Sequence, residues 1–250
     1  MAQLAVAVLP VSVYLAANAS VLLRAQVLLL EAAAQVLASL ARLTVVSVFA
    51  ITFLLQPSQI PSGSMEPTML VGDYVLVNKQ VFAPAGHWRW LLPYREPVRD
   101  SIIVFHYPVD PRELLVKRVI AVPGDRLHLH RGAVVLNGTP LSEPFTVYTP
   151  TERNRYRDEF PTLERADPGV EAAWWIELRR SIRAGELPVP AGNYFAMGDN
   201  RNNSQDSRFW GFVPQGTILG EPLLVYLSVD VTGTTPRGRL RLGRSLRVLH

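Results

Sequence analysis

The chain has 250 residues, of which 48% are hydrophobic and 18% charged, and this composition excludes a disordered or fibrous protein. Lysine and arginine number 25 against 21 aspartate and glutamate residues, so the net charge of +4 is too small to make nucleic acid the expected partner. The absence of cysteine excludes disulfides, catalytic thiols and thiolate metal sites. Any hydrolytic chemistry must therefore use oxygen, nitrogen or carboxylate groups.

Residues 1–56 are predicted to form a membrane anchor. They carry only three charged side chains: Arg24, Glu31 and Arg42. The uncharged stretch 43–55 is shorter than the roughly 20 residues that a helix needs to cross a bilayer, so the span must extend back through residues 32–41. A second apolar stretch, residues 4–23, leaves the number of transmembrane helices open at one or two.

The alternative to an anchor is a cleavable signal peptide. The first 23 residues lack a positive n-region, and the apolar character continues well beyond a normal cleavage site. Arg24 and Arg42 flank the N-terminal side of the last span, whereas only Lys79 is positive in the roughly 30 residues after it. The positive-inside rule therefore places the rest of the chain outside the cytoplasm.

Beyond residue 56 the hydrophobic pattern changes to short alternating runs, which predict a mainly β structure. The predicted strands are 74–78, 101–107, 115–122, 126–130, 133–137, 194–197 and 218–229. Turn sequences such as Pro123-Gly124-Asp125 and Asn137-Gly138 separate them. Residues 57–148 and 189–230 are expected to form a β-rich core.

Two segments differ in composition from this core. Residues 149–188 are rich in charged and aromatic side chains, and residues 169–183 have helical spacing, so an inserted subdomain with a helix is expected. Residues 231–250 carry five arginines and no acidic residue, interleaved with leucine and valine. This pattern is typical of a tail that binds anionic lipid, or equally of a solvated basic tail or an edge strand.

A serine-rich segment, residues 59–73, directly follows the last apolar span. It contains Ser62-Gly63-Ser64 between two prolines, which hold the chain extended and stiff. Such rigidity suits a nucleophile, although a Ser-Gly-Ser sequence between prolines is more often a linker. The segment is not a Gly-x-Ser-x-Gly elbow, so an α/β-hydrolase is not expected.

A serine nucleophile needs a base, and histidine is the usual one. The five histidines are His87, His106, His128, His130 and His250. None forms a helical i, i+4 pair, and His128-x-His130 is typical of a surface pair, so no metal site is expected. Lysine replaces histidine in some serine enzymes. Only two lysines, Lys79 and Lys117, are present.

Lys117 lies in an apolar run that predicts a buried strand. Because side chains alternate along a strand, Lys117 and Arg118 should point to opposite faces, and one of them must face apolar surroundings. Lowering the pKa of a lysine from ~10.4 to ~7, as a base requires, corresponds to ~4.6 kcal/mol. The alternative is a lysine at a strand edge with its amine in solvent.

A third polar segment, residues 198–214, is dense in Asp, Asn, Ser and Arg and ends in aromatic residues. By composition it is an ordered loop whose side chains bond to the backbone and to each other. It lacks the central glycine and terminal glutamate of an EF-hand, so a calcium site is not expected.

Taken together, these segments resemble bacterial type I signal peptidase, also called leader peptidase. The resemblance covers nearly the whole chain and rests on four motifs: Ile60-Pro-Ser-Gly-Ser-Met65-x-Pro-Thr, Gly72-Asp-Tyr-Val-Leu-Val-Asn-Lys79, Lys117-Arg118 followed by Pro123-Gly124-Asp125, and Gly198-Asp-Asn-Arg with Asn203-Ser204-x-Asp206-Ser-Arg208-x-Trp210-Gly. It implies a β catalytic domain with a small α/β insertion, anchored in the bacterial inner (plasma) membrane and facing outward. The implied activity is a serine endopeptidase without cofactor or metal. Its partners would be the bilayer and exported precursors, whose signal peptides it would cleave after small-x-small motifs.

The resemblance also implies roles for individual residues. Ser64 would be the nucleophile and Lys117 the general base. The Ser62 hydroxyl and the Ser64 backbone N–H would form the oxyanion hole, and Ser204 would hydrogen-bond and orient Lys117.

Further roles concern support of the site and choice of substrate. Arg118 with Asp199, and Asp206 with Arg208, would form ion pairs that hold the site together. Shallow apolar pockets for the substrate would be lined by Ile60, Met65, Met69, Leu115 and Val116. Position 58, usually aromatic in such enzymes, is serine here, which leaves the lining of the outer pocket open.

Two alternatives remain open at this point. A tethered β-rich scaffold would use the serine segment only as a linker, but a degenerate relative would be expected to lose one of Ser64, Lys117 and Ser204. A self-cleaving repressor shares the Ser/Lys chemistry, but it would need an N-terminal helix-turn-helix where this chain has an apolar segment.

Overall fold

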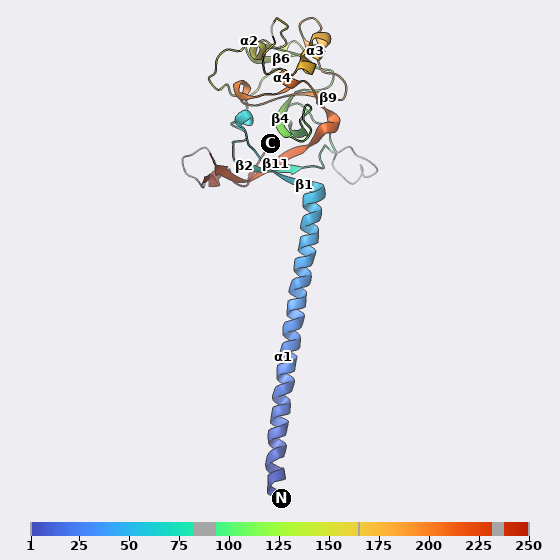
Figure 1. Cartoon of the computed structure of the whole chain (residues 1–250), viewed down its shortest axis with the longest axis vertical. Helices are drawn as coiled ribbons and strands as arrows, with labels where there is room; N and C mark the ends of the chain where they lie inside the picture. The colour runs from blue at the N-terminus through green and yellow to red at the C-terminus, as the bar shows by residue number, and fades with distance from the viewer. Residues whose placement is uncertain (1, 83–93, 165, 232–237, 250) are drawn as a thin grey trace. The chain divides into compact units, whose positions relative to one another are not determined.

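The computed structural model describes residues 2–82, 94–164, 166–231 and 238–249 (Figure 1). The chain divides into two compact units between Thr52 and Phe53. Among the histidines, His87 and His250 lie outside the described residues, as do positions 232–237 of the predicted tail.

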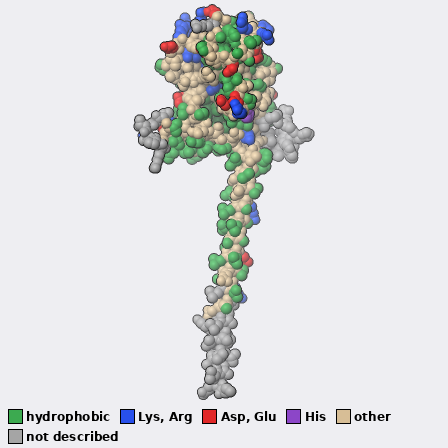
Figure 2. Space-filling view, in the orientation of Figure 1, with side chains coloured by type: hydrophobic (Ala, Val, Ile, Leu, Met, Phe, Trp, Pro, Cys, Tyr) green, Lys and Arg blue, Asp and Glu red, His purple; other side chains and the backbone are tan. Residues whose placement is uncertain are grey.

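The N-terminal unit is one continuous helix, α1 (Ala2–Phe49), followed by a π-helical turn at Ala50–Leu54. Within the described residues, one stretch, Leu23–Leu54, is long and apolar enough to cross a membrane. Its described side chains are exposed, and Figure 2 shows hydrophobic side chains along it. Residues 4–23, the second predicted span, belong to the same helix and are not a separate one.

The second unit is mainly β, in agreement with the alternating pattern of the sequence. Its larger sheet has nine strands within the described residues, in the order β1-β2-β11-β3-β4-β9-β10, with β12 and β13 also paired to β11. These strands are β1 (Leu55–Gln59), β2 (Asp73–Asn78), β3 (Ile102–His106), β4 (Leu114–Ala121), β9 (Asn193–Met197), β10 (Val213–Pro214), β11 (Ile218–Asp230), β12 (Arg239–Leu240) and β13 (Arg247–Val248). All their pairings are antiparallel.

A smaller sheet, in the order β7-β6-β5-β8, carries the rest of the β structure. Its strands are β5 (Arg126–His130), β6 (Ala133–Leu136), β7 (Thr139–Pro140) and β8 (Leu187–Pro188). The helices of this unit are α2 (Arg155–Asp158), α3 (Ala172–Ser181) and α4 (Ser207–Trp210). In Figure 1, α2, α3 and β6 lie at the top of the unit and β1, β2 and β11 at its base. The helix predicted at 169–183 corresponds to α3, and its segment joins the smaller sheet through β8, which pairs with β5.

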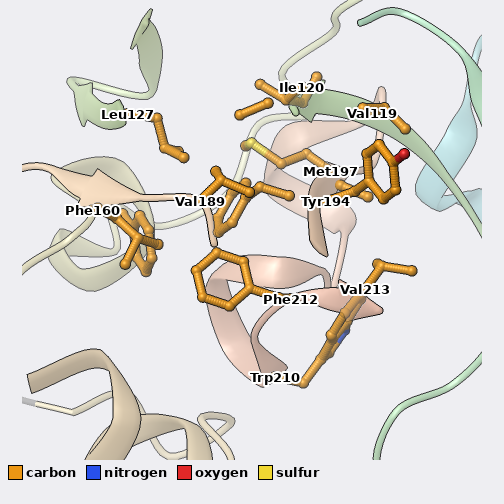
Figure 3. Packing of buried hydrophobic residues seen from close by; sticks show 14 of the residues in the cluster. Val119, Ile120, Leu127, Phe160, Val189, Tyr194, Met197, Trp210, Phe212 and Val213 are labelled. Atoms are coloured by element: carbon orange, nitrogen blue, oxygen red, sulfur yellow. The ribbon is translucent and has the colours of Figure 1, made fainter. Parts of the chain in front are cut away.

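Two apolar clusters pack on the strands. The large cluster includes Phe160, Tyr194, Phe212 and Trp210, whose aromatic rings lie among aliphatic side chains (Figure 3). The small cluster is made of Ile60, Met65, Met69, Val75, Val77, Ile102, Val104, Val225 and Leu249, with Val116 and Leu219 packed against it. β4 contributes to both, because its alternate side chains point to opposite faces.

The sequence pattern did not predict strand β1. Its sequence, Leu-Gln-Pro-Ser-Gln, has no apolar alternation, yet all five residues pair with β2. Pro57 is compatible with this position because β1 lies at the edge of the sheet, where a missing N–H costs no ladder bond on the open side. This edge strand leads the chain from the helical unit to the serine-rich segment.

The described part of the predicted basic tail, residues 238–249, is folded onto β11. β12 pairs with Val229–Asp230 and β13 with Leu224–Val225. Part of this segment therefore forms short edge strands, and its binding to anionic lipid stays a prediction.

Candidate active site

Ser64 lies in a short 3-10 turn, Gly63–Met65, between β1 and β2, and it is buried. The turn is attached to the polar loop 198–203 by the backbone. The Asn200 N–H donates to the Ser64 carbonyl at 3.1 Å, and the Asn200 side chain donates to the Gly63 carbonyl at 3.3 Å. Two distant segments of the chain therefore fix the position of the Ser64 backbone.

Lys117 lies on β4 and is also buried, with 4% of its surface exposed. Its Nζ donates a hydrogen bond to Ser64 Oγ at 2.7 Å, although 53 residues separate the two in the sequence. Burial removes water from the ammonium and lowers the pKa of Lys117 to about 8, with Asp206 and Asp199 opposing the shift and Arg208 adding to it. The amine is therefore neutral in a large fraction of molecules near pH 8.

Arg118 points to the opposite face of β4 from Lys117, as the alternation predicts, and it too is buried. Its guanidinium makes a two-pronged ion pair with Asp199, at 2.8 Å and 2.7 Å. The same guanidinium lies 3.9 Å from the centre of the Phe145 ring. The Asp199 carboxylate and the Phe145 ring therefore stabilise the buried positive charge of Arg118.

Asp199 has a further partner that the sequence reasoning did not identify. The Thr68 hydroxyl donates to its carboxylate at 2.6 Å. Thr68 lies four residues after Ser64, so this bond connects the serine segment to the Arg118–Asp199 pair. The threonine is part of the serine motif, but spacing alone gives no sign of its partner 131 residues away.

Asp206 and Arg208 form a second buried ion pair, with two contacts of 2.8 Å. Burial alone would raise the pKa of Asp206, but the charge and hydrogen bonds of Arg208, the charge of Lys117 and the Gly198 N–H together hold that pKa below its usual range. The pair stabilises the polar loop, because Arg208 also donates to the Arg201 carbonyl at 2.8 Å.

Ser204 is close to the site but does not make the bond expected of it. Its Oγ is buried and has no hydrogen-bond partner among the described residues. The prediction that Ser204 hydrogen-bonds Lys117 is therefore wrong for this structure. In this structure the Lys117 amine donates to Ser64 Oγ, and Ser204 Oγ lies beside Gly198, 2.3 Å from where a Cβ on that glycine would stand.

Gly198 is the point of closest approach between these segments. A Cβ built at this position would lie 2.3 Å from Ser204 Oγ and 2.4 Å from the Ser64 carbonyl oxygen. Both separations are far below van der Waals contact, so only glycine fits here. Gly198 is part of one of the motifs on which the resemblance rests. The motif alone does not show why this residue must be glycine, because the reason is its contact with two segments that are distant in the sequence.

Ser62 stands at the start of the 3-10 turn and is exposed. Its Oγ lies 3.4 Å from Ser64 Oγ, at the long limit of a hydrogen bond. The Ser62 hydroxyl is thus next to the Ser64 hydroxyl.

A strap formed by residues 143–149 covers the polar loop and was not identified from the sequence. Val147 exchanges backbone hydrogen bonds with the Asp199 carbonyl and the Arg201 N–H. Glu143 forms a buried ion pair with Arg201, and the Thr149 hydroxyl donates to the Asn200 side chain at 2.8 Å. Phe145, which stacks on Arg118, belongs to the same strap.

The residues predicted to line the substrate pockets fall into two groups. Ile60, Met65 and Met69 are buried in the small cluster, and Val116 packs against it. Leu115 does not join them, because neighbouring residues of β4 point to opposite faces, and it packs against the large cluster instead.

The other titratable groups do not gather into a metal site. Among the described residues, no group of three or more His, Cys, Asp or Glu side chains is placed to hold a metal ion. On the smaller sheet, half-buried His128 lies 3.5 Å from Glu186, and exposed His130 lies 3.1 Å from Glu159.

The sequence is similar to known proteins over most of its length. The family model for signal peptidase, peptidase S26, matches residues 33–227. Signal peptidase I of Pseudomonas fluorescens is 34% identical over 194 residues, covering 71% of this chain and 66% of the relative. The Pseudomonas aeruginosa enzyme is 35% identical with the same coverage, and that of Aquifex aeolicus is 32% identical, covering 74% of this chain and 80% of the relative.

The chain thus spans just under two thirds of the length of the two Pseudomonas relatives. Among solved structures, a signal peptidase I from Enterococcus faecalis V583 is 30% identical and covers 51% of this chain with a TM-score of 0.37. The match of the family model to most of the chain, together with identities above 30% to these relatives, shows that the chain belongs to the signal peptidase family, peptidase S26.

Proposed function

We propose that this chain is a membrane-bound serine endopeptidase that removes N-terminal signal peptides from exported precursors, with Ser64 as nucleophile and Lys117 as general base. One observation carries the proposal: a buried lysine amine lies 2.7 Å from a buried serine hydroxyl. A solvent-exposed lysine would stay charged near neutral pH and could not accept the proton of the hydroxyl. Membership of the signal peptidase family supports the same activity.

The chemistry begins with Lys117 in its neutral form. Its amine accepts the proton of Ser64 as Oγ attacks the scissile carbonyl carbon, and a tetrahedral intermediate forms. The Ser64 backbone N–H and the Ser62 hydroxyl are the donors that we assign to the developing oxyanion. Lys117 then gives its proton to the leaving amine, and an acyl-enzyme ester remains on Ser64.

Hydrolysis of that ester repeats the same steps with water. Lys117 takes a proton from the attacking water, the ester bond to Oγ breaks, and Oγ regains the proton from the lysine. The signal peptide leaves with a new carboxylate, so atoms and charge balance over the cycle. No metal or cofactor takes part in the proposed reaction.

Substrate selection follows from the small cluster. We assign Ile60, Met65, Met69 and Val116 to the walls of the pockets that receive the small side chains of an extended small-x-small segment. These walls are apolar, which suits the apolar side chain of alanine. Ser58, half-buried on β1, leaves the outer pocket wider than an aromatic residue would.

The helix Leu23–Leu54 supports membrane attachment, because an exposed apolar surface of this length is unstable in water. We place the β unit on the extracytoplasmic face, because Arg24 lies at the N-terminal end of this helix, whereas only Lys79 is positive in the roughly 30 residues after it. Signal peptides emerge at this surface, so the anchor brings the enzyme to its substrate.

The test of the proposed function is a cleavage assay on the full chain in detergent. An exported precursor with an Ala-x-Ala site is incubated with the wild-type protein, and the new N-terminus of the product is sequenced. We expect a single cut directly after Ala-x-Ala and no cut in a precursor whose two alanines are replaced by leucine. An intact precursor, or equal cleavage of both precursors, would show that the chain is a scaffold or a protease of another specificity.

The lowered pKa of Lys117 predicts the pH dependence of the reaction. Because the base must be neutral, kcat/KM should rise with pH and level off above an apparent pKa of about 8. The measurement is kcat/KM between pH 6 and 10 on a short peptide substrate. A profile that is flat over this range would be incompatible with Lys117 as the base.

A further inference from the structure

The C-terminal residues 238–249 pack beside the segment that follows Ser64. They run along β11, with β12 at one end, β13 at the other and a 3-10 turn, Leu242–Arg244, between them. β11 also pairs with β2, which begins at Asp73. The C-terminal segment is therefore next to the turn formed by residues 68–73.

Arg244 holds this turn through two groups. Its Nη2 donates to the Asp73 carboxylate at 2.7 Å and to the Thr68 carbonyl at 3.0 Å. Asp73 is fully buried and also accepts from the Ser228 hydroxyl at 2.6 Å and from the Leu70 N–H at 2.9 Å. One arginine side chain thus joins the first and last residues of the turn.

The other side of the turn is attached to the candidate active site. The Thr68 hydroxyl donates to Asp199, which is paired with Arg118. Arg118 is the residue next to Lys117, so a continuous series of polar contacts runs from Arg244 through Thr68 to the strand that carries the base. Met69 lies within the turn, and its N–H donates to the Met65 carbonyl at 2.9 Å.

Leu249 adds an apolar contact from the same segment. It is buried in the small cluster with Ile60, Met65 and Met69, which are the side chains that we assign to the substrate pockets. Its backbone N–H donates to the Leu223 carbonyl at 3.0 Å, so pairing with β11 fixes its position. By contrast, Leu242 and Leu246 of the same segment are 76% exposed.

We infer that Arg244 and Leu249 are positioning residues of the substrate site: Arg244 fixes the turn that carries Met69, and Leu249 supports the apolar cluster from behind. The inference rests on the proposed function. Neither residue touches Ser64 or Lys117, so both act on substrate binding and selection and not on proton transfer.

Arg244→Gln in the full chain tests the first part. We expect KM for an Ala-x-Ala peptide to rise about tenfold, with kcat changed less than about twofold and the apparent pKa of the pH profile unchanged. Arg244→Lys should restore part of the loss, because an ammonium keeps the charge but cannot contact both Asp73 carboxylate oxygens as Nε and Nη2 of Arg244 do, at 3.4 Å and 2.7 Å. Arg247→Gln, which removes an exposed arginine of the same segment, is the matched control and should behave as wild type.

Leu249→Ala tests the second part. Without the Leu249 side chain, the small cluster should be packed less tightly and the substrate pocket should accept a larger residue. The measurement is the ratio of kcat/KM for alanine to kcat/KM for valine at the cleavage site. We expect this ratio to fall about tenfold. Leu242→Ala is the matched control and should keep the wild-type ratio. A wild-type ratio in Leu249→Ala would overturn the second part. If Arg244→Gln does not fold, as judged by its thermal melt, KM of Arg244→Lys tests the first part in its place, and a wild-type KM in that variant would overturn it.

Hydrogen exchange separates this inference from the proposed function. In Arg244→Gln, amides of residues 68–73 should exchange faster than in wild type, whereas those of β3 should not change. If the wild-type chain cleaves no precursor, the proposed function fails, and exchange still reports whether Arg244 holds the turn. If the wild-type chain is active and Arg244→Gln shows wild-type KM and wild-type exchange, the inference on Arg244 is overturned and the proposed function stands.

Discussion

Lys117→Met is expected to abolish precursor cleavage, with kcat/KM reduced by at least about 10⁴-fold, and to leave the fold intact. Methionine has a similar length but no basic nitrogen, so Ser64 loses the group that takes its proton. Because burial disfavours the lysine ammonium, the variant should melt at the same temperature as wild type or higher. The measurements are single-turnover cleavage and a thermal melt.

Two further variants show whether the loss reflects the base. Lys117→Arg keeps a positive charge that cannot be removed near neutral pH, so it should be as inactive as Lys117→Met. Ser64→Ala should likewise be inactive, whereas Ser181→Ala on α3 is a matched serine control and should cleave normally. Normal product from Lys117→Met, Lys117→Arg or Ser64→Ala would disprove the assignment of the pair.

Gly198→Ala should cause the second-largest loss, although Gly198 has no reactive group. The new methyl would overlap Ser204 Oγ and the Ser64 carbonyl oxygen, at 2.3 Å and 2.4 Å, and would push the nucleophile away from Lys117. A displacement of about 1 Å in an active site can reduce the rate about 100-fold. We expect kcat to fall by at least this factor, together with a lower melting temperature from overpacking.

Gly216→Ala is the matched control, because a Cβ at Gly216 meets no atom within 4 Å. It should keep wild-type activity and stability. Wild-type kcat in Gly198→Ala would mean that the polar loop and the serine turn move apart easily. The hydrogen bonds of Asn200 to Gly63 and Ser64 in that turn argue against this.

The β architecture could be predicted from the sequence where strands are half-buried. Residues 126–130 alternate strictly, and their Leu127 and Leu129 are buried in the large cluster, as the alternation requires. β1 could not be predicted, because its pairing with β2, and not an apolar face, makes it a strand. For the same reason, β12 and β13 could be predicted only as one alternative for the basic tail: both exist only as partners of β11.

The candidate site shows a similar division. The resemblance, which rests on the order and type of the motif residues, identified Ser64 and Lys117 as the candidate pair. Without it, the local sequence pattern favoured a linker for Ser64 and a strand edge for Lys117. Thr68, Phe145 and Gly198 were not assigned roles, because each depends on a contact with a residue far away in the sequence. The expected hydrogen bond between Ser204 and Lys117 was wrong. The sequence motif indicates which residues lie near the site, but it does not indicate the direction in which the Ser204 hydroxyl points.

The most direct test of the central claim is the titration of Lys117 itself. The chain contains only two lysines, so full-length protein labelled with ¹³C-lysine gives two side-chain signals, and Lys117→Met identifies one of them by its loss. We predict that this signal titrates with a midpoint of about 8. A midpoint at the ordinary lysine value of ~10.4 or above would show that Lys117 stays charged in the folded protein, and would contradict its role as the base for Ser64.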